Sequence, residues 1–350
     1  MTQLVWVLLI GLGAVAVVQV VGLVLGRVGR EAHERRQQRR HQAVRAVILT
    51  ALLGEPDEAG RARAELRGRS GGAWSDVEEQ AFAMIPKIKG ESHDALVTLL
   101  LSKGASTRAA ELARSRSQVA RARAAHRLGA LAQGDAVPVL LTLLRDHTFL
   151  VRRTAVRALG QVADPLAVPA LLDALTADPH LTRDVLGAID RIGPQAAPVL
   201  RRELAQVLTD PEENRRAALT ATGLGVLGDV SAVGLLTVAL EDREQPGLAV
   251  AAAEALGAVG SPEAVDPLCW ALEGRGDDVR AAAATALGAV GDASATERLV
   301  AALDDEDHLT SRAVAAALLR LGEPGRHALE TSPSPYAAEA LAVHRVRLGV

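Results

Sequence analysis

Cysteine and aromatic residues are nearly absent from this chain of 350 residues. The one cysteine, Cys269, excludes a disulfide bond within the chain and excludes zinc or iron–sulfur sites built from several cysteines. Aromatic side chains make up only 2% of the sequence, whereas a compact α/β enzyme usually buries more rings. Small aliphatic side chains take their place and favour closely packed helices, because alanine has the highest helix propensity.

Two common signatures of catalytic sites are also missing. The sequence contains no phosphate-binding loop that ends in Gly-Lys-Ser or Gly-Lys-Thr, and no His-Glu-x-x-His zinc motif. Its nine histidines show no spacing typical of metal ligands. We therefore expect no catalytic residue, no metal site and no cofactor.

A long uncharged run opens the chain. Residues 4–25 contain no charged side chain and one polar side chain, Gln19. As a helix this run would extend about 33 Å, which is enough to cross a bilayer. No basic residue precedes the run, and its apolar core is longer than that of a secretory signal peptide. The sequence predicts one transmembrane helix over residues 4–25, where Gly22 and Gly26 have the spacing that packs transmembrane helices together.

A dense group of arginines follows the uncharged run. Basic flanks stay on the cytoplasmic side of a membrane. We therefore expect a bacterial plasma-membrane protein with three residues outside and the remaining chain in the cytoplasm. The same arginines are candidates for contacts with anionic lipid headgroups. Those closest to the membrane include Arg35, Arg36, Arg39 and Arg40.

The rest of the chain contains an internal repeat. An aliphatic residue, in most units followed by glycine, recurs at separations of 31, 30, 35, 32, 31 and 31 residues. The aligned residues are Leu128, Leu159, Ile189, Leu224, Leu256, Leu287 and Leu318. Repeats of this length indicate stacked supersecondary units that share one continuous core.

Each repeat contains two helical patterns. Apolar residues at i, i+4 and i+8 in segments such as 151–159 predict a first helix with one buried face. A capping residue then lies five positions after the aligned aliphatic residue and predicts the start of a second helix. These candidate caps are Asp164, Asp229, Ser261 and Asp292.

Residues 117–330 resemble the HEAT-repeat family, in particular its short bacterial type found in phycobilisome-lyase-like proteins. The resemblance implies an all-α fold, an α-solenoid of helical hairpins preceded here by a single transmembrane helix. We divide the chain into an anchor (1–25), a basic juxtamembrane and irregular helical cap (26–116), and repeats with a C-terminal capping helix (117–350). Asp190 departs from the Leu-Gly motif, so we expect the third unit to bend the stack.

Trp270 is the main candidate for binding a partner. Thr142, Asp173 and Arg202 occupy the same position in the second helices of other repeats. The repeat pattern predicts that this position lies outside the apolar face that packs into the core. By the resemblance, we expect second helices to line the concave face, where an exposed ring could anchor a protein partner. The alternative is a ring that lies flat over the neighbouring unit.

Six arginines crowd the first helices of two successive units. They are candidates for contacts with phosphate or lipid headgroups, and a solvated convex face is the alternative. The six are Arg121, Arg123, Arg127, Arg152, Arg153 and Arg157.

Charge is distributed unevenly along the repeats. Residues 103–157 contain eleven Lys or Arg and three acids, whereas residues 210–310 contain six Arg and nineteen acids. The acidic half is either a solvated surface or a surface suited to basic partners.

Together these features favour a membrane-anchored scaffold or accessory subunit of a bacterial envelope complex, with membrane-associated protein partners. The alternative is a subunit of an enzyme, either lyase-like or associated with a glycosyltransferase. Cys269 would then be a candidate thiol. It occupies the same position of the repeat as Leu172, however, and this position is predicted to be buried. A nucleic-acid-binding role is disfavoured by the anchor, the acidic half and the shortage of aromatic residues.

Overall fold

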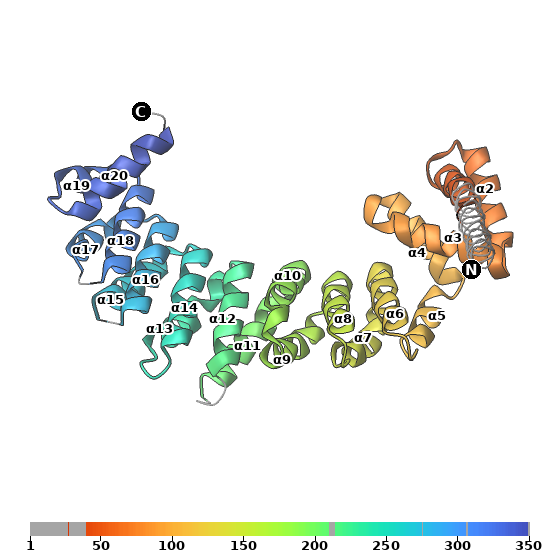
Figure 1. Cartoon of the computed structure of the whole chain (residues 1–350), viewed down its shortest axis with the longest axis horizontal. Coiled ribbons are helices and arrows are strands. Elements are labelled where there is room, and N and C mark those ends of the chain that lie inside the picture. The colour runs from red at the N-terminus through yellow and green to blue at the C-terminus, as the bar shows by residue number, and fades with distance from the viewer. Residues whose placement is uncertain (1–26, 28–39, 210–213, 275, 306, 349–350) are drawn as a thin grey trace, which may run out of the picture. The chain divides into compact units, whose positions relative to one another are not determined.

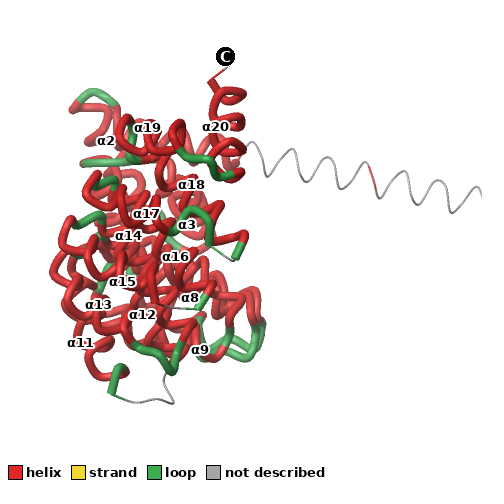
Figure 2. Tube along the Cα trace, turned by 90° about the vertical axis from the view of Figure 1, so that its left-hand side faces the viewer, coloured by secondary structure: helices red, strands yellow, loops and turns green. Residues whose placement is uncertain are grey.

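The computed structural model describes residues 27, 40–209, 214–274, 276–305 and 307–348. These residues form helices joined by short loops, and Figure 2 shows no strand among them. The predicted all-α fold is therefore confirmed. The predicted membrane span 4–25 lies outside the described residues, as do Gly22, Gly26, Arg35, Arg36 and Arg39. Within the described part, no helix combines the length and the apolar character needed to cross a bilayer.

The chain forms two compact units, residues 1–107 and 108–350. In the first unit a helix at 40–53 is followed by three further helices and a short 3₁₀ turn (Figure 1). They are α2 (Pro56–Gly68), α3 (Gly71–Met84), η1 (Ile85–Lys87) and α4 (Glu91–Ser102). Helix α5 (Ala105–Leu112) contains the division between the units, slightly before the predicted start of the repeats at residue 117.

Helix α2 was not predicted from the sequence. Pro56 begins it at a position where the missing N–H group costs nothing, and three small or medium side chains form its buried stripe. They are Ala59, Ala62 and Leu66. The stripe is narrow and lies among charged residues, so the apolar pattern is weak. Helix α2 ends at Gly68 and α3 begins at Gly71, so only two residues join them.

Residues 68–72 read Gly-Arg-Ser-Gly-Gly and thus match the Gly-x-Ser-x-Gly pattern of hydrolase nucleophiles. That motif requires a strand before the serine and a helix after it. Here the segment joins α2 to α3, so its surroundings do not support a catalytic serine.

The second unit is a solenoid of helical hairpins, as predicted. Its first helices are α6 (Gln118–Leu131), α8 (Phe149–Val162), α10 (Thr182–Ile192), α12 (Asn214–Leu227), α14 (Pro246–Val259), α16 (Asp277–Val290) and α18 (His308–Arg320). Its second helices are α7 (Val137–Leu144), α9 (Val168–Ala177), α11 (Ala197–Val207), α13 (Val233–Glu241), α15 (Val265–Gly274), α17 (Thr296–Ala301) and α19 (Glu323–Thr331). Helix α20 (Pro335–Leu348) follows them as the predicted C-terminal helix. All seven aligned aliphatic residues are buried.

The predicted caps lie at the turns between the paired helices. The side chains of Asp164 and Asp292 each accept a hydrogen bond of 2.9 Å from the backbone N–H two residues later, and Ser261 accepts one of 3.4 Å. Each begins a short 3₁₀ turn that leads into the second helix. Asp229 is the exception, because its side chain makes no cap bond and pairs with Arg201 instead.

First helices of successive repeats pack closely against one another, whereas second helices touch one another at few points. At five steps a Cβ added to a first-helix glycine would lie 2.6–2.7 Å from the Cα of an alanine on the next first helix. The pairs are Gly129 with Ala158, Gly160 with Ala188, Gly225 with Ala255, Gly257 with Ala286 and Gly288 with Ala317. Glycine is needed there because only hydrogen fits.

The row of helices with the closer spacing lies on the inner side of a curved stack. Figure 1 shows the first helices of the second unit on the inner side of its curve and the second helices on the outer side. Our expectation that second helices line the concave face was therefore wrong. The small residues that let first helices approach one another determine the direction of curvature.

The step from the third to the fourth repeat differs from the other steps. At this step Asp190 on α10 replaces the motif glycine, and Gly223 on α12 replaces the alanine that faces it. The glycine of this contact therefore lies on the later helix and not on the earlier one. Helices α10 and α12 pack less closely than most other neighbouring first helices. The structure thus shows a looser contact at this step, and the expected bend stays a prediction.

Candidate functional site

Residues at the sixth position of the second helices from α7 to α17 form an exposed row on the outer face of the second unit. The members are Thr142, Asp173, Arg202, Val238, Trp270 and Ala301, and all six are exposed. The repeat pattern predicted that Thr142, Asp173, Arg202 and Trp270 lie outside the buried face of their helices, and all four are exposed in the structure. Their role in binding stays a prediction.

Trp270 is the largest side chain in this row. Its residue is 63% exposed, and a ring that lies flat over the neighbouring repeat stays the alternative to a binding anchor. It lines a pocket of about 350 Å³ at the ends of α13 and α15. The other lining residues are Leu240, Glu241, Arg243, Pro267, Ala271 and Gly274. Val238, in the same register one repeat earlier, is 55% exposed.

Two polar members of the row, Asp173 and Thr142, have partners within the chain. Asp173 pairs with Arg216 of α12, which also donates a hydrogen bond of 2.7 Å from Nη2 to Glu203. The hydroxyl of Thr142 donates to the carbonyl oxygen of Pro138 over 3.1 Å. Trp270 is the largest apolar side chain that this row exposes, and Val238 is the other large one.

Two of the candidate arginines on the first helices make ion pairs between successive repeats. Arg152 donates from Nη2 to Asp178 over 2.5 Å, and Arg153 donates from Nε to Asp184 over 2.9 Å. Both guanidinium groups thus hold successive repeats together. Contact of Arg152 and Arg153 with lipid or phosphate stays a prediction, as does that of Arg40, which is exposed at the start of the helix at 40–53.

A repeated Arg–Asp pair was missed at the level of sequence. The arginine lies seven residues before the aligned leucine, and the aspartate lies 25 or 26 residues later in the next interhelical link. The pairs are Arg121 with Asp146, Arg152 with Asp178, and Arg280 with Asp305. Each aspartate also accepts a backbone N–H bond at the start of the next first helix. The sequence feature that could have revealed these pairs is the recurring separation of 25 or 26 residues between the arginine and the aspartate.

The first of these pairs is the most enclosed. Arg121 donates from Nε to Oδ2 of Asp146 over 2.6 Å and from Nη2 to Oδ1 over 3.0 Å, which is a bidentate arrangement. Both side chains are about nine-tenths buried. The hydrogen bonds from Arg121, with one from the backbone of Thr148, lower the pKa of the Asp146 carboxyl to about 2.

Comparison with known families identifies the repeat. A family model described as HEAT repeats matches residues 105–189, 201–282 and 265–342, which together cover more than half of the chain. The chain belongs to the HEAT-repeat family. A search of curated proteins found no match.

Solved structures match this chain at low sequence identity and with TM-scores below 0.5. Human deoxyhypusine hydroxylase is 20% identical, with 81% of this chain and 97% of that chain covered and a TM-score of 0.33. The complex of CpcE and CpcF of phycocyanin lyase from Nostoc is 24% identical, with coverages of 68% and 92% and a TM-score of 0.32. Importin beta is 14% identical, with coverages of 88% and 53% and a TM-score of 0.41.

The residues that could carry chemistry in this HEAT-repeat chain lie apart or are buried. Cys269 is buried in α15, as its register predicted, and burial raises the pKa of its thiol. Among the described residues, no three His, Cys, Asp or Glu side chains gather in an arrangement that could hold a metal ion. The exposed outer row is therefore the best-defined candidate site of the repeat array.

Proposed function

We propose that this protein is a membrane-tethered scaffold that binds a protein partner on the outer face of its repeats, with Trp270 as the anchor. The observation that carries the proposal is an exposed tryptophan beside a pocket, in a chain that has only three tryptophans. Large aromatic side chains contribute much of the binding energy of protein interfaces. The proposal assigns no reaction to the chain itself.

The partner surface should be basic with an apolar side chain at its centre. Residues 210–310 contain nineteen acids and six arginines, and Asp266 and Glu241 are exposed near Trp270 on α15 and α13. An acidic surface attracts a basic partner and accelerates its association. Trp270 and Val238 would supply the apolar contact.

Replacing Trp270 by alanine is expected to weaken partner binding at least about tenfold, because the anchor side chain is lost. The full chain would be used to capture partners from detergent extracts of bacterial membranes, and the affinity of the captured protein would then be titrated. Leu166→Ala is the matched control, since Leu166 is 78% exposed on the turn before α9. Equal affinity of both variants would contradict the proposed face. An enzyme among the captured partners would instead support the enzyme-subunit alternative.

The tether is proposed from the uncharged run at 4–25 and the arginines that follow it. A protease added to intact bacterial cells is expected to leave the repeats undigested, and permeabilising the inner membrane should expose them. Immunoblotting for the C-terminal helix provides the measurement. Digestion in intact cells would reverse the orientation, and recovery of the full chain in the soluble fraction would refute the tether.

A further inference from the structure

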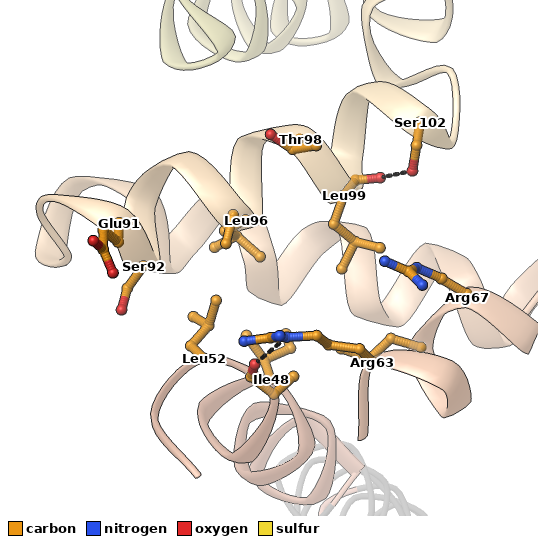
Figure 3. A pocket seen from close by; sticks show the side chains of 13 residues that line it. Ile48, Leu52, Arg63, Arg67, Glu91, Ser92, Leu96, Thr98, Leu99 and Ser102 are labelled. Atoms are coloured by element: carbon orange, nitrogen blue, oxygen red, sulfur yellow. Dashed lines mark hydrogen bonds between the residues drawn. The ribbon is translucent and has the colours of Figure 1, made fainter. Parts of the chain in front are cut away.

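The first unit contains a pocket that plays no part in the proposed interaction with proteins. Its volume is about 470 Å³, and it lies between the helix at 40–53, α2 and α4 (Figure 3). The lining consists of Ile48, Ala51, Leu52, Arg63, Leu66, Arg67, Glu91, Ser92, Ala95, Leu96, Thr98, Leu99 and Ser102. All of these residues belong to the same compact unit.

Aliphatic side chains from all three helices line the pocket. Ile48, Leu66 and Leu96 are at most 1% exposed. Leu52 and Leu99 are only half-buried, and Figure 3 shows both projecting into the space between their helices. Leaving half-buried leucines beside an open pocket forgoes hydrophobic stabilisation, which an apolar occupant would restore.

Two cations line this apolar space. Arg63 and Arg67 are one turn apart on α2, and in Figure 3 Arg63 extends toward Leu52 while Arg67 ends beside Leu99. A hydrogen bond of 2.8 Å from Nε to the carbonyl oxygen of Ala51 holds Arg63 in place. Like charges at i and i+4 repel each other, so an anion between them would be stabilised. The one acidic lining residue, Glu91, lies at the opposite end of the pocket.

We propose that this pocket binds a long-chain anionic amphiphile. Its acyl chain would lie against the leucines, and its carboxylate or phosphate would pair with Arg63 and Arg67. The volume falls within the range of about 300–1,000 Å³ typical of small-molecule sites, and an apolar lining with a few charged groups is also typical of them. The amphiphile could be a free fatty acid or a phospholipid, because both present the same chemistry. The proposal is independent of Trp270 and of the protein partner.

Photocrosslinking of the full chain in phosphatidylcholine nanodiscs tests the proposal. One arm uses palmitate that carries a diazirine in its chain, and the other uses phosphatidylglycerol with the same label. We expect adducts on peptides from 48–52 and 95–102, with the productive arm identifying the source of the amphiphile. Unlabelled palmitate should compete at least about tenfold better than methyl palmitate, which lacks the charge. Adducts in neither arm, adducts elsewhere, or equal competition by the ester would overturn the proposal.

Two variants and a control separate binding from folding. Ala95 is exposed at the pocket wall, so Ala95→Trp should fill the pocket without disturbing the core and should abolish labelling. The double variant Arg63→Gln, Arg67→Gln should weaken labelling about tenfold through loss of the charge-assisted bonds. Arg61→Gln is the control, because Arg61 is exposed on α2 and does not line the pocket. Unchanged labelling of Ala95→Trp would overturn the proposal even if the double variant failed to fold.

Discussion

Replacing Gly257 by alanine is expected to lower the free energy of unfolding of the repeat array by about 2 kcal/mol. The added Cβ would lie 2.7 Å from Cα and 2.8 Å from Cβ of Ala286. Both atoms belong to the next first helix, so relief requires movement of a helix and not of a flexible side chain. Overpacking of this kind costs about 3 kcal/mol, and the higher helix propensity of alanine offsets about 1 kcal/mol.

The same chemical change at Gly234 is expected to have the opposite sign. Gly234 lies within α13, is exposed, and has no atom within 4 Å of an added Cβ. Alanine there should stabilise the array by about 0.5–1 kcal/mol through helix propensity alone. Urea denaturation of the two variants measures both effects. A stabilised Gly257→Ala protein would show that the first helices are not in close contact.

The hairpins could be predicted from the sequence because one feature recurs with a constant period. The aligned leucines and the caps at Asp164, Ser261 and Asp292 define the ends of paired helices. The contact that curves the array could not be predicted in the same way. It joins the glycine after one aligned residue to the alanine before the next aligned residue, and where Asp190 and Gly223 stand at these two positions the helices pack less closely. The inner face was consequently assigned to the wrong helices.

The candidate sites could be predicted from the sequence only where the repeat fixes the position of a residue in its helix. The exposure of Trp270 followed from its register in the repeat. The pocket of the first unit did not, because that part of the chain has no repeat and α2 buries a stripe made mostly of alanine. The Arg–Asp pairs were overlooked because the aspartates occupy interhelical links, where an acidic residue suggests only a solvated loop.

The most enclosed of these pairs gives the second large expected effect. Asp146→Asn should lower the free energy of unfolding by about 2–3 kcal/mol at pH 7, because it leaves the buried charge of Arg121 without its bidentate partner. Asp135→Asn is the control, since Asp135 is exposed in the turn before α7 and its change should cost less than about 0.5 kcal/mol. Urea denaturation at pH 7 compares the variants. A loss equal to that of the control would show that the pair contributes nothing to stability.

The pH dependence of this difference distinguishes lost charge pairing from lost packing. The pKa of the Asp146 carboxyl is about 2 in the folded chain, below the ordinary value of 3.8. A carboxyl with a lowered pKa stabilises the fold fully above its ordinary pKa, and this stabilisation is lost as the pH falls through the folded pKa. The advantage of the wild type over Asp146→Asn should therefore be constant from pH 7 to about pH 5 and shrink by about 1–2 kcal/mol between pH 4 and pH 2. Because the asparagine cannot titrate, a difference that stays constant down to pH 2 would mean that its cost arises from altered packing and not from the Arg121 charge.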